Sequence, residues 1–240
     1  MIELRNVEIW KRAVDAISAF ITEGNFRFSE QGIKFKATDP SQIVLVDFEL
    51  DKKVFDKYDI EPTYVGLDVS ELGKIMSRAQ ASDKLYMDLT DSELIIKLEG
   101  ELMRTFNLPL IDVPDVEINP PKQNFDAKVE IAAKILRECL KDASLFDSSV
   151  ILKVKNTQFL IEAKSNHGTL SELAKKTRNV EIKASSEAVA KYSLSFFQNI
   201  VKEAHPDDKI SLELKSDSPM KVSYKIGTST IQFYLAPMTF

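Results

Sequence analysis

The sequence predicts an α+β fold of two similar domains, each built from antiparallel sheets with two helices. Similar stretches recur about 125 residues apart, since the patterns at 9–37 and 69–89 return at 132–163 and 194–214. The other segments are mostly short alternating runs rich in β-branched and aromatic residues, separated by turn residues. Only four segments carry helical periodicity, too few for the crossovers of a parallel sheet.

The elements follow in the same order in both halves. Helices are expected at 9–21, 69–79, 132–143 and 194–204. Strand segments are expected within 26–37 and 152–163, which turns at 29–32 and 155–157 interrupt, and at 83–89, 93–99, 103–108, 208–214, 221–226 and 230–235.

Each predicted helix has an apolar stripe and, on its opposite side, a polar face turned to solvent, which we call the presented face. The stripes predict these buried residues: Ile9, Ala13, Val14, Ile17, Phe20 and Ile21; Leu72, Ile75, Met76 and Ala79; Ile135, Leu136, Cys139 and Ala143; Phe196, Phe197, Ile200, Val201 and Ala204. Cys139 therefore has a core role, and a single cysteine excludes an internal disulfide or a multi-cysteine metal site.

A proline-rich segment separates the two halves. Pro114, Pro120 and Pro121 cannot donate to a central strand ladder, so 112–126 is predicted to be an extended linker. It divides an N-terminal domain at 1–117 from a C-terminal domain at 127–240. The alternation of Val113, Val116 and Ile118 indicates that parts of the linker dock on the body of the protein.

The composition excludes several classes of protein. No apolar run approaches the roughly 20 residues of a membrane span, and the start of the chain is no secretory signal, so we expect a protein that stays inside the cell. There is no phosphate-binding glycine loop, no His-Glu helix motif and no nucleophile elbow. His167 and His205 sit beside turn residues. We therefore expect no enzyme, no metal and no cofactor.

The charge is unevenly distributed. The net charge is −5, which argues mildly against a protein that binds nucleic acid non-specifically over its whole surface. The presented helix faces nevertheless hold eight basic and four acidic residues, although wider windows reduce this excess. If the halves are pseudo-symmetric, these faces share one surface that suits phosphates, contacted without regard to base sequence. Ordinary solvated helix faces are the alternative.

Four stretches carry a resemblance to a known family: 35–47, 108–112, 141–145 and 234–237. They resemble the DNA sliding clamps of the proliferating cell nuclear antigen family, most closely the archaeal ones, over essentially the whole chain. The resemblance implies the DNA clamp fold, with three subunits closing a ring whose helices line the hole. It implies a processivity factor that encircles duplex DNA and tethers replication and repair enzymes.

The resemblance implies that the basic residues on the presented helix faces contact DNA. By position Lys11, Arg12, Lys74, Lys141 and Lys202 match DNA-facing positions of the family, with Arg78, Lys134 and Arg137 as neighbours.

The resemblance also implies a pocket for short partner motifs, a glutamine followed by an aliphatic and two aromatic residues. The matching residues come from a loop, the linker and the tail: Gln42, Ile43 and Leu45, Val116 and Ile118, Pro219, and Tyr234, Ala236 and Pro237. A free tail would add a strand to a bound peptide. Residues 238–240, Met-Thr-Phe, depart from the family's usual tail.

Ring closure by family position pairs the strand at 101–110 with the strand at 168–176 of the next subunit. The contact residues are Arg104, Thr105, Phe106 and Asn107 on one edge and Thr169, Leu170, Ser171 and Glu172 on the other. Both a homotrimer and a ring of different chains are consistent with this resemblance.

Expected partners are double-stranded DNA, further copies of the chain, a clamp loader, DNA polymerase, flap endonuclease and DNA ligase, with no membrane. Localisation is cytoplasmic and nucleoid-associated for an archaeal protein, or nuclear for a eukaryotic one. The alternative function is a ring-like interaction scaffold or checkpoint-type clamp subunit without a replicative role.

Overall fold

The computed structural model describes residues 1–240, which form two compact units. The first unit comprises 1–40, 46–118 and 226–231, and the second comprises 41–45, 119–225 and 232–240. Both units are antiparallel α+β structures with two helices each, which confirms the predicted fold class. None of the helices has the length and apolar character needed to cross a membrane.

The elements repeat in the same order. The chain first forms β1 (Ile2–Leu4), α1 (Val7–Ser18), β2 (Glu23–Ser29), β3 (Gly32–Thr38), β4 (Val44–Asp51), η1 (Lys52–Val54), β5 (Lys57–Tyr58), β6 (Thr63–Asp68), α2 (Val69–Ser77), β7 (Lys84–Leu89), β8 (Glu93–Glu99) and β9 (Met103–Pro109). It then forms β10 (Ala127–Ala132), α3 (Ala133–Ala143), β11 (Ser149–Lys155), β12 (Gln158–Ser165), β13 (Gly168–Lys175), β14 (Val180–Ala184), β15 (Ala188–Ser193), α4 (Leu194–Val201), β16 (Lys209–Leu214), β17 (Met220–Ile226) and β18 (Ser229–Leu235). Helix α2 begins at residue 69 and α4 at 194, so the predicted repeat is present in the structure.

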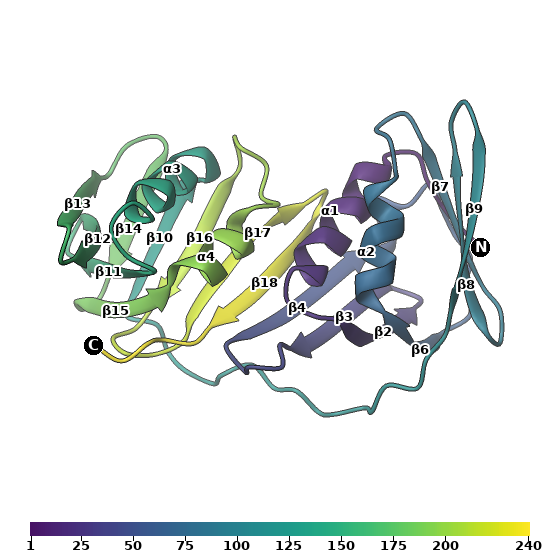
Figure 1. Cartoon of the computed structure of the whole chain (residues 1–240), viewed down its shortest axis with the longest axis horizontal. Coiled ribbons are helices and arrows are strands. Elements are labelled where there is room, and N and C mark those ends of the chain that lie inside the picture. The colour runs from purple at the N-terminus through teal and green to yellow at the C-terminus, as the bar shows by residue number, and fades with distance from the viewer. The chain divides into compact units, whose positions relative to one another are not determined.

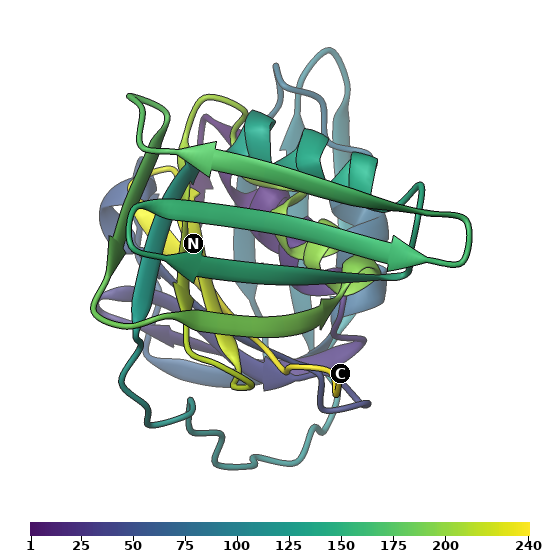
Figure 2. The ribbon, with the colours of Figure 1, turned by 90° about the vertical axis from the view of Figure 1, so that its left-hand side faces the viewer.

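The strands of each unit pair antiparallel in two groups. In the first unit the orders are β5-β1-β7-β8-β9 and β3-β2-β6, and in the second they are β14-β10-β16-β17 and β13-β12-β11-β15. Strands β9 and β13 each lie at the end of a sheet. Figure 2 shows the second of these edges, with β13 at the upper end of the antiparallel row β13-β12-β11-β15.

Two helices lie side by side in each unit (Figure 1). Glycine permits the close approach in the first unit, because a Cβ at Gly73 would lie 3.0 Å from the Ser18 Oγ. In the second unit the Gln198 Nε2 donates to the Leu140 carbonyl at 3.1 Å. Each pair thus forms one layer that covers its sheet with an apolar stripe.

The predicted helix boundaries and stripes need correction. Helix α1 runs over 7–18 rather than 9–21, and it buries Trp10 while Ile9 is only half-buried. In α3 the buried residues include Leu136 and Leu140, so the stripe is centred further round the helix than predicted. Ile135 and Cys139 of α3 are consequently half-buried, so Cys139 is not the core residue that was predicted. Ile75 of α2 and Phe196 of α4 are also only half-buried.

Candidate nucleic-acid interface and binding surfaces

The candidate cations lie on or at the ends of the four helices. Lys11 and Arg12 are in α1, Lys74 and Arg78 are in or at the end of α2, Lys134, Arg137 and Lys141 are in α3, and Lys202 follows α4. Lys74, Arg78, Lys134, Lys141 and Lys202 are exposed, and the other three are half-buried. The cations of each unit therefore occupy one helical layer.

The exposed lysines of these helices have carboxylate partners. The Lys74 Nζ lies 2.5 Å from the Glu71 Oε1, and the Lys141 Nζ lies 2.7 Å from the Glu138 Oε1, both one helical turn apart. Two further pairs are Lys134 with Asp207 at 3.0 Å and Lys202 with Glu203 at 3.9 Å. Because exposed pairs contribute about 0–1 kcal/mol, a DNA phosphate can displace the carboxylate.

Two of the candidate cations already have backbone partners. The Arg137 guanidinium donates to the carbonyls of Val201 at 3.1 Å, Lys202 at 2.7 Å and Ala204. At the corresponding place in the first unit, the Lys11 Nζ donates to the Ala79 carbonyl at 3.4 Å. Both side chains thus satisfy carbonyls at or just beyond the C-terminus of the neighbouring helix, where a cation is favoured. The structure gives Arg137 and Lys11 a structural role that the sequence did not reveal.

A small cavity opens between α3 and α4. Its volume is about 290 Å³, and it is lined by Arg137, Leu140, Lys141, Gln198, Asn199, Val201 and Lys202. Three cationic side chains and two amides surround a short apolar floor. The Arg137 guanidinium and the Gln198 amide at this cavity already donate to backbone carbonyls, which leaves the two lysines at its rim for other contacts.

The residues predicted for partner binding fall into both units. Within the second unit the Ala236 amide donates to the Ile43 carbonyl at 2.8 Å, so the loop before β4 and the tail lie together. Gln42 is exposed and has a φ of 58°, a left-handed conformation that turns the loop sharply. Leu45 is buried, and Tyr234 and Pro237 are half-buried.

The tail is not free, contrary to our expectation. The Met238 amide donates to the Lys191 carbonyl of β15 at 2.7 Å, forming an isolated antiparallel bridge. Together with the Ala236 bond, this places two tail amides in intramolecular hydrogen bonds. The sequence could not reveal these contacts, because main-chain pairing needs no particular side chain.

The linker contributes a different set of residues. Val116 is 66% exposed and Ile118 is half-exposed, and both belong to the first unit. In the second unit the Gln123 Nε2 donates to the Pro219 carbonyl at 2.6 Å. Val116 is therefore an exposed apolar side chain that is accessible to a partner.

The predicted subunit edges lie at the ends of their sheets. Strand β13 alternates between half-buried and exposed residues and has no fully buried one, unlike its neighbours β12 and β11. On β9 the outward residues Thr105 and Asn107 are exposed, while Arg104 and Phe106 are half-buried. Thr169 and Ser171 are exposed, whereas Leu170 and Glu172 face inward and are half-buried. Both strands thus retain an unpaired edge and incompletely covered side chains.

Cys139 lies against the inner face of β13. Burial, followed by a hydrogen bond with Glu172, raises the pKa of the Cys139 thiol to about 12. The thiol therefore stays protonated at neutral pH and is a poor nucleophile.

Arg104 anchors β9 to the rest of the first unit. Its guanidinium donates to the Arg78 carbonyl at 2.7 Å and forms an ion pair with the Asp83 carboxylate, which also accepts from the Gln80 amide at 2.7 Å. The Asp83 side chain is 1% exposed. This part-buried pair ties the end of α2 to the edge strand.

We expect Asp83→Ala to lower the free energy of unfolding by about 3 kcal/mol, because it leaves the Arg104 guanidinium part-buried without its carboxylate. Asp88→Ala is the control, since Asp88 is an exposed carboxylate beside the chain's amino group, and it should cost under about 0.5 kcal/mol. Urea unfolding measures both. Equal losses in the two variants would contradict the structural role of the Asp83–Arg104 pair.

Two units that repeat one element order, each with a paired helical layer and a free strand edge, define the class of two-domain clamp folds. The family models described as proliferating cell nuclear antigen, N-terminal domain and C-terminal domain, match residues 1–113 and 119–239. The chain belongs to the proliferating cell nuclear antigen family.

Archaeal relatives match nearly the whole chain. The DNA polymerase sliding clamp of Thermofilum pendens is 31% identical and covers 95% of this chain and 94% of its own. DNA polymerase sliding clamp 1 of Thermococcus kodakarensis is 32% identical, with 92% and 90% covered. A crystal structure of PCNA from Thermococcus kodakaraensis has a TM-score of 0.94 at 22% identity and covers 99% of both chains, so the fold is shared.

Proposed function

We propose that the protein is a DNA polymerase sliding clamp that closes a three-subunit ring around duplex DNA. The carrying observation is the pair of open edges at β9 and β13, one in each unit of a chain that belongs to a clamp family. A head-to-tail contact between unlike edges forms a closed ring when the rotation between successive subunits closes, and three subunits close it when each is turned by about 120°. The names of the archaeal relatives support the same function.

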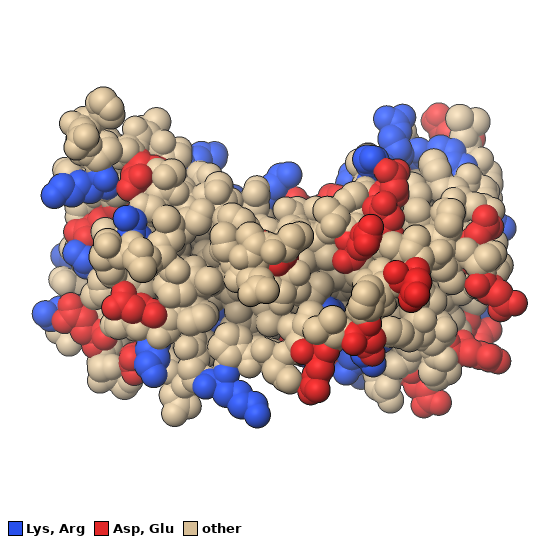
Figure 3. Space-filling model, turned by 60° about the horizontal axis from the view of Figure 1, so that its bottom comes forward, with Lys and Arg blue, Asp and Glu red and all other residues tan.

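The helical layers are the proposed DNA surface. Lys74, Lys141 and Lys202 are the proposed mobile phosphate contacts, with Arg12, Arg78 and Lys134 beside them, whereas Lys11 and Arg137 mainly hold the helices together. Contacts of this kind are independent of base sequence and weaken with salt. Acidic side chains are frequent on the linker side of the first unit (Figure 3), and their negative charge disfavours binding of the DNA backbone to that side.

The partner pocket is proposed at Gln42, Ile43, Leu45, Val116, Ile118, Pro219, Tyr234, Ala236 and Pro237. Its ligands are short peptides with a glutamine, an aliphatic and two aromatic residues, contributed by the polymerase, clamp loader, flap endonuclease and DNA ligase. A bound motif that adds a strand along the tail must replace the bonds of Ala236 and Met238, so tail rearrangement accompanies such binding.

The proposed domains are 1–117 and 127–240, joined by the linker at 112–126. The protein is proposed to act by binding alone, without catalysis, in the cytoplasm of an archaeal cell. The subunits of the ring are proposed to be copies of this chain, which carries both the β9 edge and the β13 edge that a head-to-tail contact needs.

Solution mass and polymerase stimulation test the function together. Light scattering of the purified chain should give about 81 kDa, three times the 27.1 kDa chain. The same sample should extend the product length of an archaeal polymerase on primed circular DNA. A 27 kDa particle without stimulation would contradict the proposal. A trimer without stimulation would instead support an interaction scaffold.

We expect Glu138→Gln to raise the affinity for duplex DNA about threefold at low salt, because it releases the Lys141 ammonium from its carboxylate. Glu187→Gln is the control, since it releases Lys155 of β11 from a similar exposed pair outside the helical layers. Fluorescence anisotropy over a salt series measures both variants. An equal gain in the control would show that net charge, rather than the helical layer, sets DNA affinity.

A further inference from the structure

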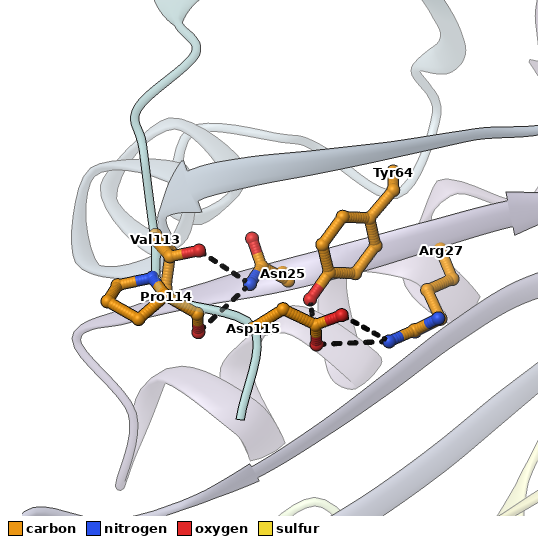
Figure 4. A network of polar contacts seen from close by, with 6 residues as sticks. All are labelled: Asn25, Arg27, Tyr64, Val113, Pro114 and Asp115. Atoms are coloured by element: carbon orange, nitrogen blue, oxygen red, sulfur yellow. Dashed lines mark hydrogen bonds and ion pairs between the residues drawn. The ribbon is translucent and has the colours of Figure 1, made fainter. Parts of the chain in front are cut away.

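Three side chains form a closed polar triangle between the linker and the sheet of the first unit (Figure 4). The Asp115 carboxylate accepts from the Arg27 Nη2 at 3.1 and 3.2 Å and from the Tyr64 hydroxyl at 2.6 Å. The Arg27 guanidinium carbon also lies 4.4 Å from the centroid of the Tyr64 ring. Each of the three residues therefore contacts the other two.

A fourth side chain fixes the backbone just before Asp115. The Asn25 Nδ2 donates to the Val113 carbonyl at 3.0 Å and lies 3.5 Å from the Pro114 carbonyl. Asn25 and Arg27 are alternate residues of β2, so both point to the sheet face opposite its buried side chains. We call Asn25, Arg27, Tyr64 and Asp115 the latch.

The latch holds the linker against the sheet beside a polar cavity. The cavity measures about 560 Å³, and its lining includes β2, β3 and linker residues from Val113 to Ile118. Two other ion pairs line it, Lys34 with Glu49 at 3.2 Å and Lys36 with Asp47 at 3.1 Å, and both pairs lie within the sheet. Because charged side chains of the sheet line this cavity beneath the linker, specific polar contacts are needed to hold the linker in place.

We propose that the latch positions the linker so that Val116 and Ile118 are presented in a fixed conformation, and thereby sets the affinity for partner peptides. This inference rests on the proposed partner pocket. Asp115 immediately precedes Val116, so holding its carboxylate restricts the backbone at the apolar contact. Without the latch, the linker must be ordered when the peptide binds, which lowers affinity.

The latch is exposed enough to open. The side chains of Arg27 and Asp115 are 59% and 56% exposed, so the ion pair is weak and sensitive to salt. Burial, and then the hydrogen bond to Asp115, raises the pKa of Tyr64. The hydroxyl therefore stays protonated and remains a donor throughout the neutral range.

The test compares Asp115→Asn and Tyr64→Phe with a matched control, Lys34→Gln, which breaks an ion pair of similar exposure in the same cavity. Hydrogen exchange should accelerate at 115–118 in the two latch variants and not in the control. Affinity for a glutamine-and-aromatic motif peptide, measured by calorimetry, should fall about two- to fivefold in Asp115→Asn. The difference from wild type should vanish at about 1 M salt, and urea unfolding should be unchanged.

The outcomes separate the latch from the pocket. If wild type binds the peptide and Asp115→Asn binds it as tightly, with unchanged exchange, the latch has no positioning role. Tighter binding by Asp115→Asn would also overturn the proposal, since the latch would then oppose binding. If wild type fails to bind the peptide, the proposed pocket is wrong, while exchange at 115–118 still decides whether the latch orders the linker.

Discussion

A single proline on the outer edge of β13 is expected to convert the protein into a folded monomer. Leu170 and Ser171 are adjacent in the ladder with β12, so their amides point to opposite sides and one of them points outward. Proline at the outward position removes a donor to the neighbouring subunit and puts its ring in the path of that strand. We expect subunit affinity to fall at least about a hundredfold, corresponding to about 3 kcal/mol.

Sedimentation of Leu170→Pro and Ser171→Pro measures this effect. Ser171→Ala is the control, because it keeps the backbone amide and should remain a trimer. The monomeric variant should keep its near-UV circular dichroism and still bind motif peptides. Trimers in both proline variants would show that β13 is not a subunit contact.

Removing the exposed cations of the helical layers should have the second-largest effect. The variant carries alanine at Lys74, Lys134, Lys141 and Lys202, which are all exposed, so stability should change little. The product length of the polymerase on primed DNA should fall about tenfold, and DNA affinity should lose most of its salt dependence.

The matched control removes the same charge from the strands, with alanine at Lys57, Lys84, Lys97 and Lys183, which are also exposed. This variant should retain wild-type stimulation over the salt series. Equal losses in both variants would attribute the effect to net charge and would contradict a DNA surface on the helices.

Elements and their order were predictable because periodicity reports local structure directly. The run Glu93–Glu99 alternates apolar and polar residues and forms β8 at the predicted boundaries. Because the two halves repeat, the elements predicted for the first half also predicted those of the second. Helix stripes were less predictable, since Trp10 and Leu140 are buried by tertiary packing that shifts the covered face.

Candidate surfaces were predictable by residue type, and their internal contacts were not. Exposed lysines on amphipathic helices are visible in sequence, whereas the bonds of Arg137 to three carbonyls depend on where α4 ends. The latch joins residues 27, 64 and 115, and no local pattern connects positions so far apart. The same holds for the pair of Asp83 with Arg104.

Topological retention on DNA tests the central claim most directly. The protein is mixed with a linear duplex whose ends carry biotin, the ends are then blocked with streptavidin, and the sample is gel-filtered in about 0.5 M salt, which suppresses phosphate contacts. A closed ring should stay with the blocked duplex and be released once a restriction enzyme cuts it between the ends. Equal loss from blocked and free-ended duplexes, or retention after cutting, would contradict a ring that encircles DNA.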